Sequence, residues 1–208
     1  MKSPLRYPGG KTRAVKHILP HFPEDMKELC SPFLGGGSIE LALASKGVKV
    51  HAYDIFEPLV CFWKHLIKNP EALAEAASLH RHLDKQTFKM LQETLRNSSQ
   101  DNIDYAAIFY ALNRSSFSGS TTAGGYSKQA AEKRFTESSI ERIKDFKAKN
   151  ISVKAADFKV SIAAHPDAFL YLDPPYLLGK GRETLYGANG SNHKGFDHLG
   201  LSETLKER

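Results

Sequence analysis

The hydrophobic and polar positions show two patterns along the chain, one of alternating strands and helices and one of helices alone. The changes between these patterns divide the chain into three stretches. In the first stretch, β-prone runs at Lys27–Cys30 and Val48–Asp54 flank a glycine-rich turn and a helix that begins near Ser38. Strand, turn, helix and strand in this order are typical of the first βαβ unit of a doubly wound α/β fold. We therefore expect a parallel sheet whose first two strands end near this turn and at Asp54.

The second stretch, residues 57–149, has the hydrophobic periodicity of helices and contains no convincing strand. A polar, glycine-containing loop at 115–127 interrupts the helices, and Ser138 with Glu141 has the pattern of a capping box. Amphipathic helices are expected at Glu71–Leu83, Thr87–Arg96 and Asn102–Asn113. This run does not fit a simple βαβ repeat, so we interpret it as a mostly helical insertion.

The α/β rhythm returns in the third stretch. Two more β-prone runs, Ile151–Asp157 and Ala168–Leu172, are followed by a helix that begins near Leu199. The pattern predicts a discontinuous α/β domain formed by residues 1–56 and 150–208, with residues 57–149 inserted into it.

Composition supports a globular protein. The chain has 208 residues, of which 41% are hydrophobic and 25% charged, which fits one domain with an insertion and excludes general disorder. No apolar run approaches the roughly 20 residues of a membrane span, and the start does not resemble a signal peptide. Cys30 and Cys61 are too few to form a disulfide framework. We expect a cytoplasmic protein without a membrane partner.

Positive charge is concentrated in two places. The net charge is +6, and five basic residues precede the first acid, Glu24. Seven more basic residues lie between Lys128 and Lys149, against four acids. Clustered cations suit a surface that follows phosphates, although solvated helix faces explain such runs equally well. Charge therefore suggests a nucleic acid partner without establishing it.

The tetrapeptide Asp173-Pro174-Pro175-Tyr176 follows a buried strand directly. Ligands of open α/β sheets bind at the carboxyl ends of the strands. Two consecutive prolines fix the backbone and remove two N–H donors, which leaves carbonyl and carboxylate acceptors beside an aromatic ring. Such a rim complements an exocyclic amine, which presents two N–H donors and a flat π-face. The alternative is a rigid turn at the end of a strand.

A second candidate site is the turn from Phe33 to Gly37, where glycines let the backbone approach a ligand. The turn lacks the spacing of a dinucleotide fingerprint and of a phosphate-binding P-loop, which favours a nucleoside ligand without a pyrophosphate. Asp54, at the end of the second strand, is placed to accept hydrogen bonds from ribose hydroxyls. Its alternative role is the N-cap of the following helix.

These motifs together resemble the Dam-like (D12 class) DNA adenine-N6 methyltransferases of bacteria and phages. Four blocks occur in the family's order, and their joint order is more specific than any one block. The blocks are Leu5-Arg6-Tyr7-Pro8-Gly9-Gly10-Lys11, Pro32-Phe33-Leu34-Gly35-Gly36-Gly37-Ser38, Tyr53-Asp54-Ile55 and Asp173-Pro174-Pro175-Tyr176. A weaker fifth block runs from Leu112 to Gly119 and includes Asn113-Arg114.

The resemblance implies a Rossmann-like sheet that uses S-adenosylmethionine, a target-recognition insertion, and further strands after residue 208. The implied activity is that of a site-specific, adenine-specific DNA methyltransferase acting on N6 of a flipped-out adenine in duplex DNA. A companion restriction endonuclease is an implied partner. The implied catalytic residues are Asp173, Pro174, Pro175 and Tyr176.

The sequence contains no Cys/His cluster, so we expect no metal site. The resemblance also implies two sets of binding residues. For the cofactor they are Tyr7, Lys11, Phe33, Gly35, Gly37, Asp54, Asp157 and Asp173. Lys11 would pair with the methionine carboxylate and Asp157 would bond the cofactor's adenine. The alternatives are a basic, flexible arm for Tyr7 and Lys11, and an exposed acid for Asp157. For DNA they are Arg6, Asn113, Arg114, Lys128, Lys133 and Arg134. Asn113 and Arg114 would reach bases in a groove, and Lys128, Lys133 and Arg134 would contact phosphates.

Three other functions stay open on the residues alone. An N4-cytosine or RNA amine methyltransferase would use the same acceptor rim. A nucleic-acid-binding fragment without catalysis would need only the basic clusters. A nucleotide-binding oxidoreductase is disfavoured by the missing dinucleotide spacing.

Overall fold

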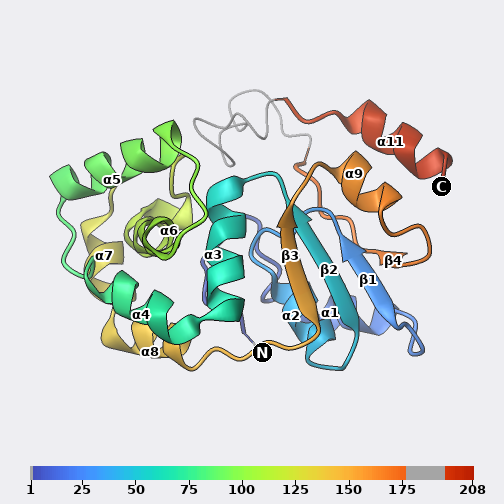
Figure 1. Ribbon diagram of the computed structural model, residues 1–208, viewed down its shortest axis with the longest axis horizontal. Coiled ribbons are helices and arrows are strands. Elements are labelled where there is room, and N and C mark those ends of the chain that lie inside the picture. The colour runs from blue at the N-terminus through green and yellow to red at the C-terminus, as the bar shows by residue number, and fades with distance from the viewer. Residues whose placement is uncertain (1, 177–194) are drawn as a thin grey trace.

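The computed structural model describes residues 2–176 and 195–208. It places a parallel sheet and its covering helices beside a group of helices formed by the middle of the chain (Figure 1). The strands are β1 (Glu28–Ser31), β2 (Lys49–Asp54), β3 (Ile151–Ala155) and β4 (Phe169–Leu170). The helices are α1 (Val15–Ile18), α2 (Ser38–Ala44), α3 (Glu57–Lys68), α4 (Pro70–Ser78), α5 (Lys85–Asn97), α6 (Ile103–Ser115), α7 (Lys128–Arg134), α8 (Glu137–Lys144), α9 (Phe158–Ala163) and α11 (His198–Lys206), with 3-10 turns η1 (Leu19–His21) and η2 (Phe117–Gly119).

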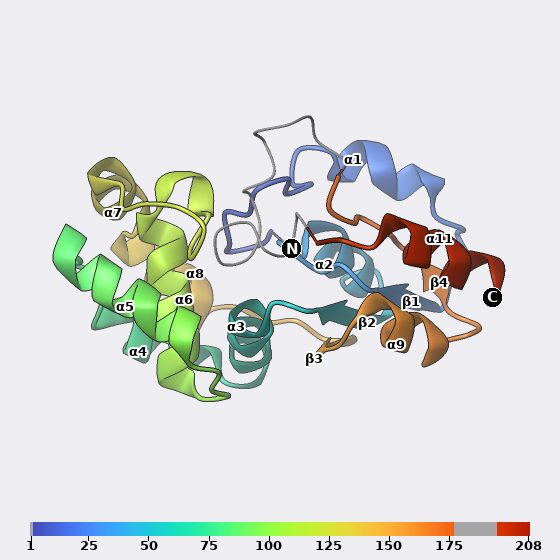
Figure 2. The same cartoon turned by 90° about the horizontal axis from the view of Figure 1, so that it is seen from above.

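The sheet has the order β3-β2-β1-β4, and each described pair of neighbours is parallel. This confirms the α/β fold and the four predicted strands, although β3 and β4 are shorter than the β-prone runs suggested. Alternation along β2 explains its two covered faces. Val50 and Ala52 face the main core, whereas Tyr53 packs on the other face against Cys30 and Ala168. Figure 2 shows α2 and α9 on opposite faces of the sheet.

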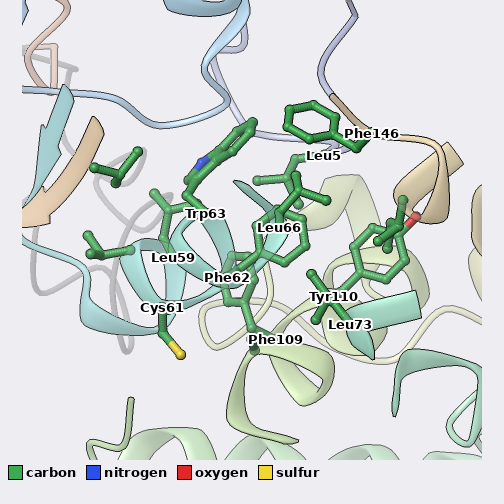
Figure 3. Close-up of a cluster of buried hydrophobic side chains, with 14 of the residues drawn as sticks. Leu5, Leu59, Cys61, Phe62, Trp63, Leu66, Leu73, Phe109, Tyr110 and Phe146 are labelled. Atoms are coloured by element: carbon green, nitrogen blue, oxygen red, sulfur yellow. The ribbon is translucent and has the colours of Figure 1, made fainter. Parts of the chain in front are cut away.

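Helix α3 joins the sheet to the helical group. Leu59, Phe62 and Trp63 are buried on α3, and the ring of Phe62 lies parallel to that of Tyr110 on α6 at 5.6 Å between centroids. Figure 3 shows these side chains in one continuous cluster. Because α3 also packs against β2 and β3, the predicted boundary at residue 57 falls inside a shared core.

The helical character of residues 57–149 is confirmed, but one predicted capping residue is wrong. Thr136 has the extended conformation of an N-cap, so α8 begins at Glu137 and places Ser138 within the first turn. The Ser138 hydroxyl bonds the Thr136 hydroxyl at 3.0 Å instead of capping the helix. Helix α9 was not predicted, because its six residues are too few to show a helical period.

No helix among the described residues has the length and apolar character needed to cross a membrane.

Candidate active site

The carboxyl edge of the sheet opens into a pocket of about 750 Å³. The pocket lies where the carboxyl ends of β1, β2 and β4 meet the N-terminal arm, which we define as residues 2–13. Figure 2 shows this arm between the helical group and α2. The pocket lining includes Tyr7, Gly9, Lys11, Phe33, Gly35, Gly37, Glu40, Asp54, Tyr171, Asp173 and Pro175.

The glycine turn, residues 33–37, brings backbone close to the arm. Gly35 has φ +46°, and a Cβ on it would lie 2.9 Å from Cε1 of the Tyr7 ring. Its carbonyl accepts a hydrogen bond from the Trp63 indole at 3.1 Å, which ties the turn to α3. The sequence predicted a close backbone approach at this turn. In the structure, the nearest group above Gly35 is Tyr7 of this chain.

Replacing Gly35 with alanine should destabilise the fold and distort the pocket. The positive φ costs about 1–2 kcal/mol for a residue with a Cβ, and the Tyr7 ring must also move. Urea unfolding should show that the free energy of unfolding falls by about 1–3 kcal/mol. Gly125→Ala is the matched control, since a Cβ there meets nothing within 4 Å. Equal stability of the two variants would contradict the close packing of Tyr7 on this turn.

Asp54 fixes the glycine turn to the end of β2. Its two carboxylate oxygens accept hydrogen bonds from the Gly35 and Phe56 amides, each at 3.0 Å. Burial raises the pKa of Asp54 above its ordinary value, and these amide bonds oppose that effect. The N-cap of α3 is Phe56, not Asp54. Each carboxylate oxygen of Asp54 keeps a further lone pair, so acceptance from a ribose hydroxyl is compatible with this arrangement.

Asp173 is held from two sides. Nζ of Lys11 lies 2.5 Å from its Oδ2, and the Tyr176 hydroxyl donates to Oδ1 at 2.6 Å. Burial disfavours the charged form of Lys11, but the bonds and charges of Asp173 and Tyr176 outweigh it and raise the pKa of Lys11. Lys11 is therefore cationic. The sequence predicted a pair with a cofactor carboxylate, whereas the structure pairs Lys11 with Asp173, 162 residues away.

Glu40 is a pocket residue that sequence reasoning missed. It lies in the first turn of α2, is 2% exposed, and accepts a hydrogen bond from the Ser31 hydroxyl at 2.6 Å. Burial raises its pKa to about 7, and the hydrogen bond from Ser31 limits the rise. An available signal was its position between Ile39 and Leu41, because a single acid inside an apolar helix run must be buried or partnered.

Asn113 and Arg114 are buried, and their predicted contact with DNA bases stays a prediction. Asn113 is 1% exposed and bonds the backbone of Arg6 through both its amide atoms, and the Gly119 carbonyl as well. Arg114 is 7% exposed and donates to the Arg134 carbonyl. Both side chains are used to hold the N-terminal arm and α7 in place.

The remaining predicted residues lie outside the pocket lining. Asp157 is exposed and caps α9 by accepting a hydrogen bond from the Lys159 amide at 2.8 Å. Lys128 and Lys133 are exposed on α7, and Lys128 lies 3.8 Å from Glu132. Arg6, which is half-buried, lines a smaller depression next to the pocket. These positions leave the predicted phosphate contacts untested.

An exposed aromatic side chain stands beside the arm. Phe117 is 72% exposed, at the start of η2, and the next residue, Ser118, has φ 54°. The loop is fixed against the arm, since a Cβ on Gly119 would lie 2.1 Å from the Arg6 carbonyl oxygen. The large apolar side chain of Phe117 is therefore accessible to a partner that approaches the arm. Sequence reasoning did not single out Phe117.

One group among the described residues has metal-ligand character. Donor atoms of Cys61, His65 and Asp101 lie within 4.8 Å of one another. Asp101 is already bonded by the Lys64 ammonium, and burial raises the pKa of the Cys61 thiol to about 11. The trio does not line the pocket.

Comparison with known proteins identifies related chains. The family model of the D12 class N6 adenine-specific DNA methyltransferases matches residues 7–208. Type II methyltransferase M1.LlaDCHI of Lactococcus lactis subsp. cremoris is 25% identical over 188 residues, covering 83% of this chain and 64% of that protein. Type II methyltransferase M.MjaIII of Methanocaldococcus jannaschii is 27% identical over 198 residues, covering 83% and 68%.

A third relative, Type II methyltransferase M.CviBI of Paramecium bursaria Chlorella virus NC1A, is 24% identical over 187 residues, covering 85% and 69%. The chain thus spans about two thirds of the length of these curated relatives.

Proposed function

Since the chain belongs to the D12 class N6 adenine-specific DNA methyltransferases, we propose that it transfers a methyl group from S-adenosylmethionine to N6 of adenine in duplex DNA. The observation that carries this proposal is the Asp173 carboxylate at the carboxyl edge of the sheet. It borders the pocket beside Pro175 and is oriented by Lys11 and Tyr176. We also propose a restriction endonuclease as the companion of this chain, because the relatives are named Type II methyltransferases.

The donor set of the pocket fits S-adenosylmethionine, which when bound supplies an electrophilic methyl group on a sulfonium. Asp54 is the proposed acceptor for the ribose hydroxyls. Phe33 and Tyr7 provide aromatic walls, and the glycine turn provides backbone without side chains that would obstruct a nucleoside. Asp157 is not included, because its carboxylate caps α9 outside the lining.

The acceptor rim explains how the target amine would be activated. Adenine N6 inside a duplex is inaccessible, so the base must leave the stack at a cost on the order of a few kcal/mol. Asp173 and the Pro174 carbonyl would accept hydrogen bonds from the two N6 hydrogens, which localises the nitrogen lone pair and directs it at the methyl group. As the bond between N6 and the methyl group formed, the bond between the sulfonium and the methyl group would break, S-adenosylhomocysteine would leave, and one N6 proton would pass to solvent. Tyr176, which is 47% exposed, would stack on the base. Most of the acceleration would come from alignment.

Transfer of labelled methyl from S-adenosylmethionine to unmethylated duplex DNA tests the proposal. Chromatography of the hydrolysed DNA should show the label in N6-methyladenine. Label in N4-methylcytosine, or preferential label in RNA, would replace the proposal with the corresponding amine methyltransferase. DNA binding with no label in any nucleic acid would identify a binding fragment without catalysis.

Phe117 gives a prediction about base flipping. Replacing Phe117 with alanine should slow methylation of a fully paired duplex by about 10- to 100-fold, because an inserted apolar side chain offsets part of the few kcal/mol that unstacking a base step costs. The loss should be much smaller on a duplex whose target adenine is mismatched, since that base is already unstacked. Phe117→Leu should keep most of the rate. An equal loss on both duplexes would mean that Phe117 does not act on the paired base.

A further inference from the structure

Among the described residues that line this pocket, Glu40 is the one carboxylate that the proposed mechanism does not use. Helix α2 otherwise turns apolar residues to the core, and an apolar side chain at this position would avoid the cost of a buried acid. Its ionisation opposes folding as the pH rises from the ordinary pKa of 4.5 to the raised value of about 7. The position is therefore unfavourable for stability at neutral pH, which points to a ligand.

The other charged side chains among the described pocket residues already have partners within the chain. Lys11 is bonded to Asp173, and Asp54 accepts hydrogen bonds from two backbone amides. None of the ion pairs among residues 2–176 and 195–208 includes Glu40. Its only hydrogen-bonding side-chain partner there is the neutral hydroxyl of Ser31. Glu40 is thus a buried carboxyl group that faces the pocket and has no cationic partner among the described residues.

We propose that Glu40 binds the α-ammonium group of the methionyl part of S-adenosylmethionine. The proposal rests on the proposed function, because it names the part of that cofactor that this carboxylate takes. An ammonium carries a full positive charge and three N–H donors, which are the properties missing around Glu40. The target amine of adenine is neutral and has its acceptors at Asp173 and Pro174. The sulfonium has no N–H to donate, so it does not match the acceptor geometry of a carboxylate.

Binding measurements on wild type and Glu40→Gln test this assignment without turnover. Three ligands separate the parts of the cofactor: S-adenosylhomocysteine, its analogue with hydrogen in place of the α-amino group, and methylthioadenosine, which lacks the amino-acid part. Isothermal titration at pH 8 should show that Glu40→Gln weakens S-adenosylhomocysteine by about 10- to 100-fold. The deaminated analogue and methylthioadenosine should change by less than about threefold.

Two controls keep the result interpretable. Glu71→Gln removes an exposed carboxylate of α4 and should leave the affinities of all three ligands unchanged. Glu40→Gln should melt at a higher temperature than wild type at pH 8, which shows that a weaker affinity is not caused by unfolding.

Wild type alone gives an independent measurement. The ratio of affinities for S-adenosylhomocysteine and its deaminated analogue should fall as the pH decreases through about 7, because Glu40 then binds a proton that the ammonium must displace. Asp173 and Tyr171 are the titratable groups that face Glu40, and Lys11 is bonded to Asp173. Both ligands meet these groups equally, so the ratio isolates the contribution of the α-amino group.

Different failures are distinguishable. Equal weakening of all three ligands by Glu40→Gln, or a flat affinity ratio between pH 6 and 8, would overturn the assignment of Glu40 while leaving the cofactor site intact. Failure of wild type to bind any of the three ligands would overturn the proposed function and this inference together.

Discussion

Asp173→Ala should lower the rate of methyl transfer to DNA by about 100- to 1,000-fold, the size expected when one pre-oriented polar group of an active site is removed. Alanine removes the acceptor for an N6 hydrogen and leaves the Lys11 ammonium without its partner at 2.5 Å. Single-turnover transfer of labelled methyl to duplex DNA measures this rate directly. Binding of S-adenosylhomocysteine, followed in parallel, shows whether the pocket still forms.

Asp173→Asn is the matched variant for this prediction. The amide oxygen of asparagine can still accept one hydrogen of the target amine, so this variant should retain more activity than Asp173→Ala. The loss of the negative charge in Asp173→Asn should therefore lower the rate less than the loss of the acceptor in Asp173→Ala. A rate for Asp173→Ala close to wild type would mean that the acceptor rim at residues 173–176 is not the site of amine activation.

The strands and the strand-end motifs were predictable because their signals are local. A β-prone run followed by a glycine turn, by Asp54 or by Asp173 places each group at one edge of a parallel sheet, and the structure brings all three to one pocket. The pair between Lys11 and Asp173 was not predictable, since it depends on how residues 162 positions apart meet. Charge alone suggested that Lys11 binds an anion but not which one.

The burial of Asn113 and Arg114 was not predicted, for a different reason. Asparagine and arginine are common contacts of nucleic acids, so the pair at 113–114 suggested an exposed recognition segment. Helix α6, however, lies at the centre of the helical group and is almost entirely buried. Its weak amphipathic pattern was the available signal, because a helix that is apolar on most sides is a core helix. Polar side chains at its end then satisfy backbone groups of the segments that pack around it.

The N-terminal arm joins these observations into one argument about how the pocket is held. Its Tyr7 ring packs on Gly35, and its Lys11 pairs with Asp173. The N–H and the carbonyl of Arg6 both form hydrogen bonds with the side-chain amide of Asn113. The arm has little regular structure before α1, so side-chain contacts must fix its position. Through the arm, Asn113 therefore links the helical group to the pocket, although Asn113 itself does not line the pocket.

Asn113→Ala should lower the free energy of unfolding by about 2–4 kcal/mol, because it leaves the Arg6 N–H, the Arg6 carbonyl and the Gly119 carbonyl without partners. Urea unfolding measures the loss, with the exposed Asn97→Ala as the control. Affinity for S-adenosylhomocysteine should also fall, since the arm that carries Tyr7 and Lys11 loses its attachment. Unchanged unfolding together with an altered DNA sequence preference would contradict this structural role and favour the predicted contact of Asn113 with DNA bases.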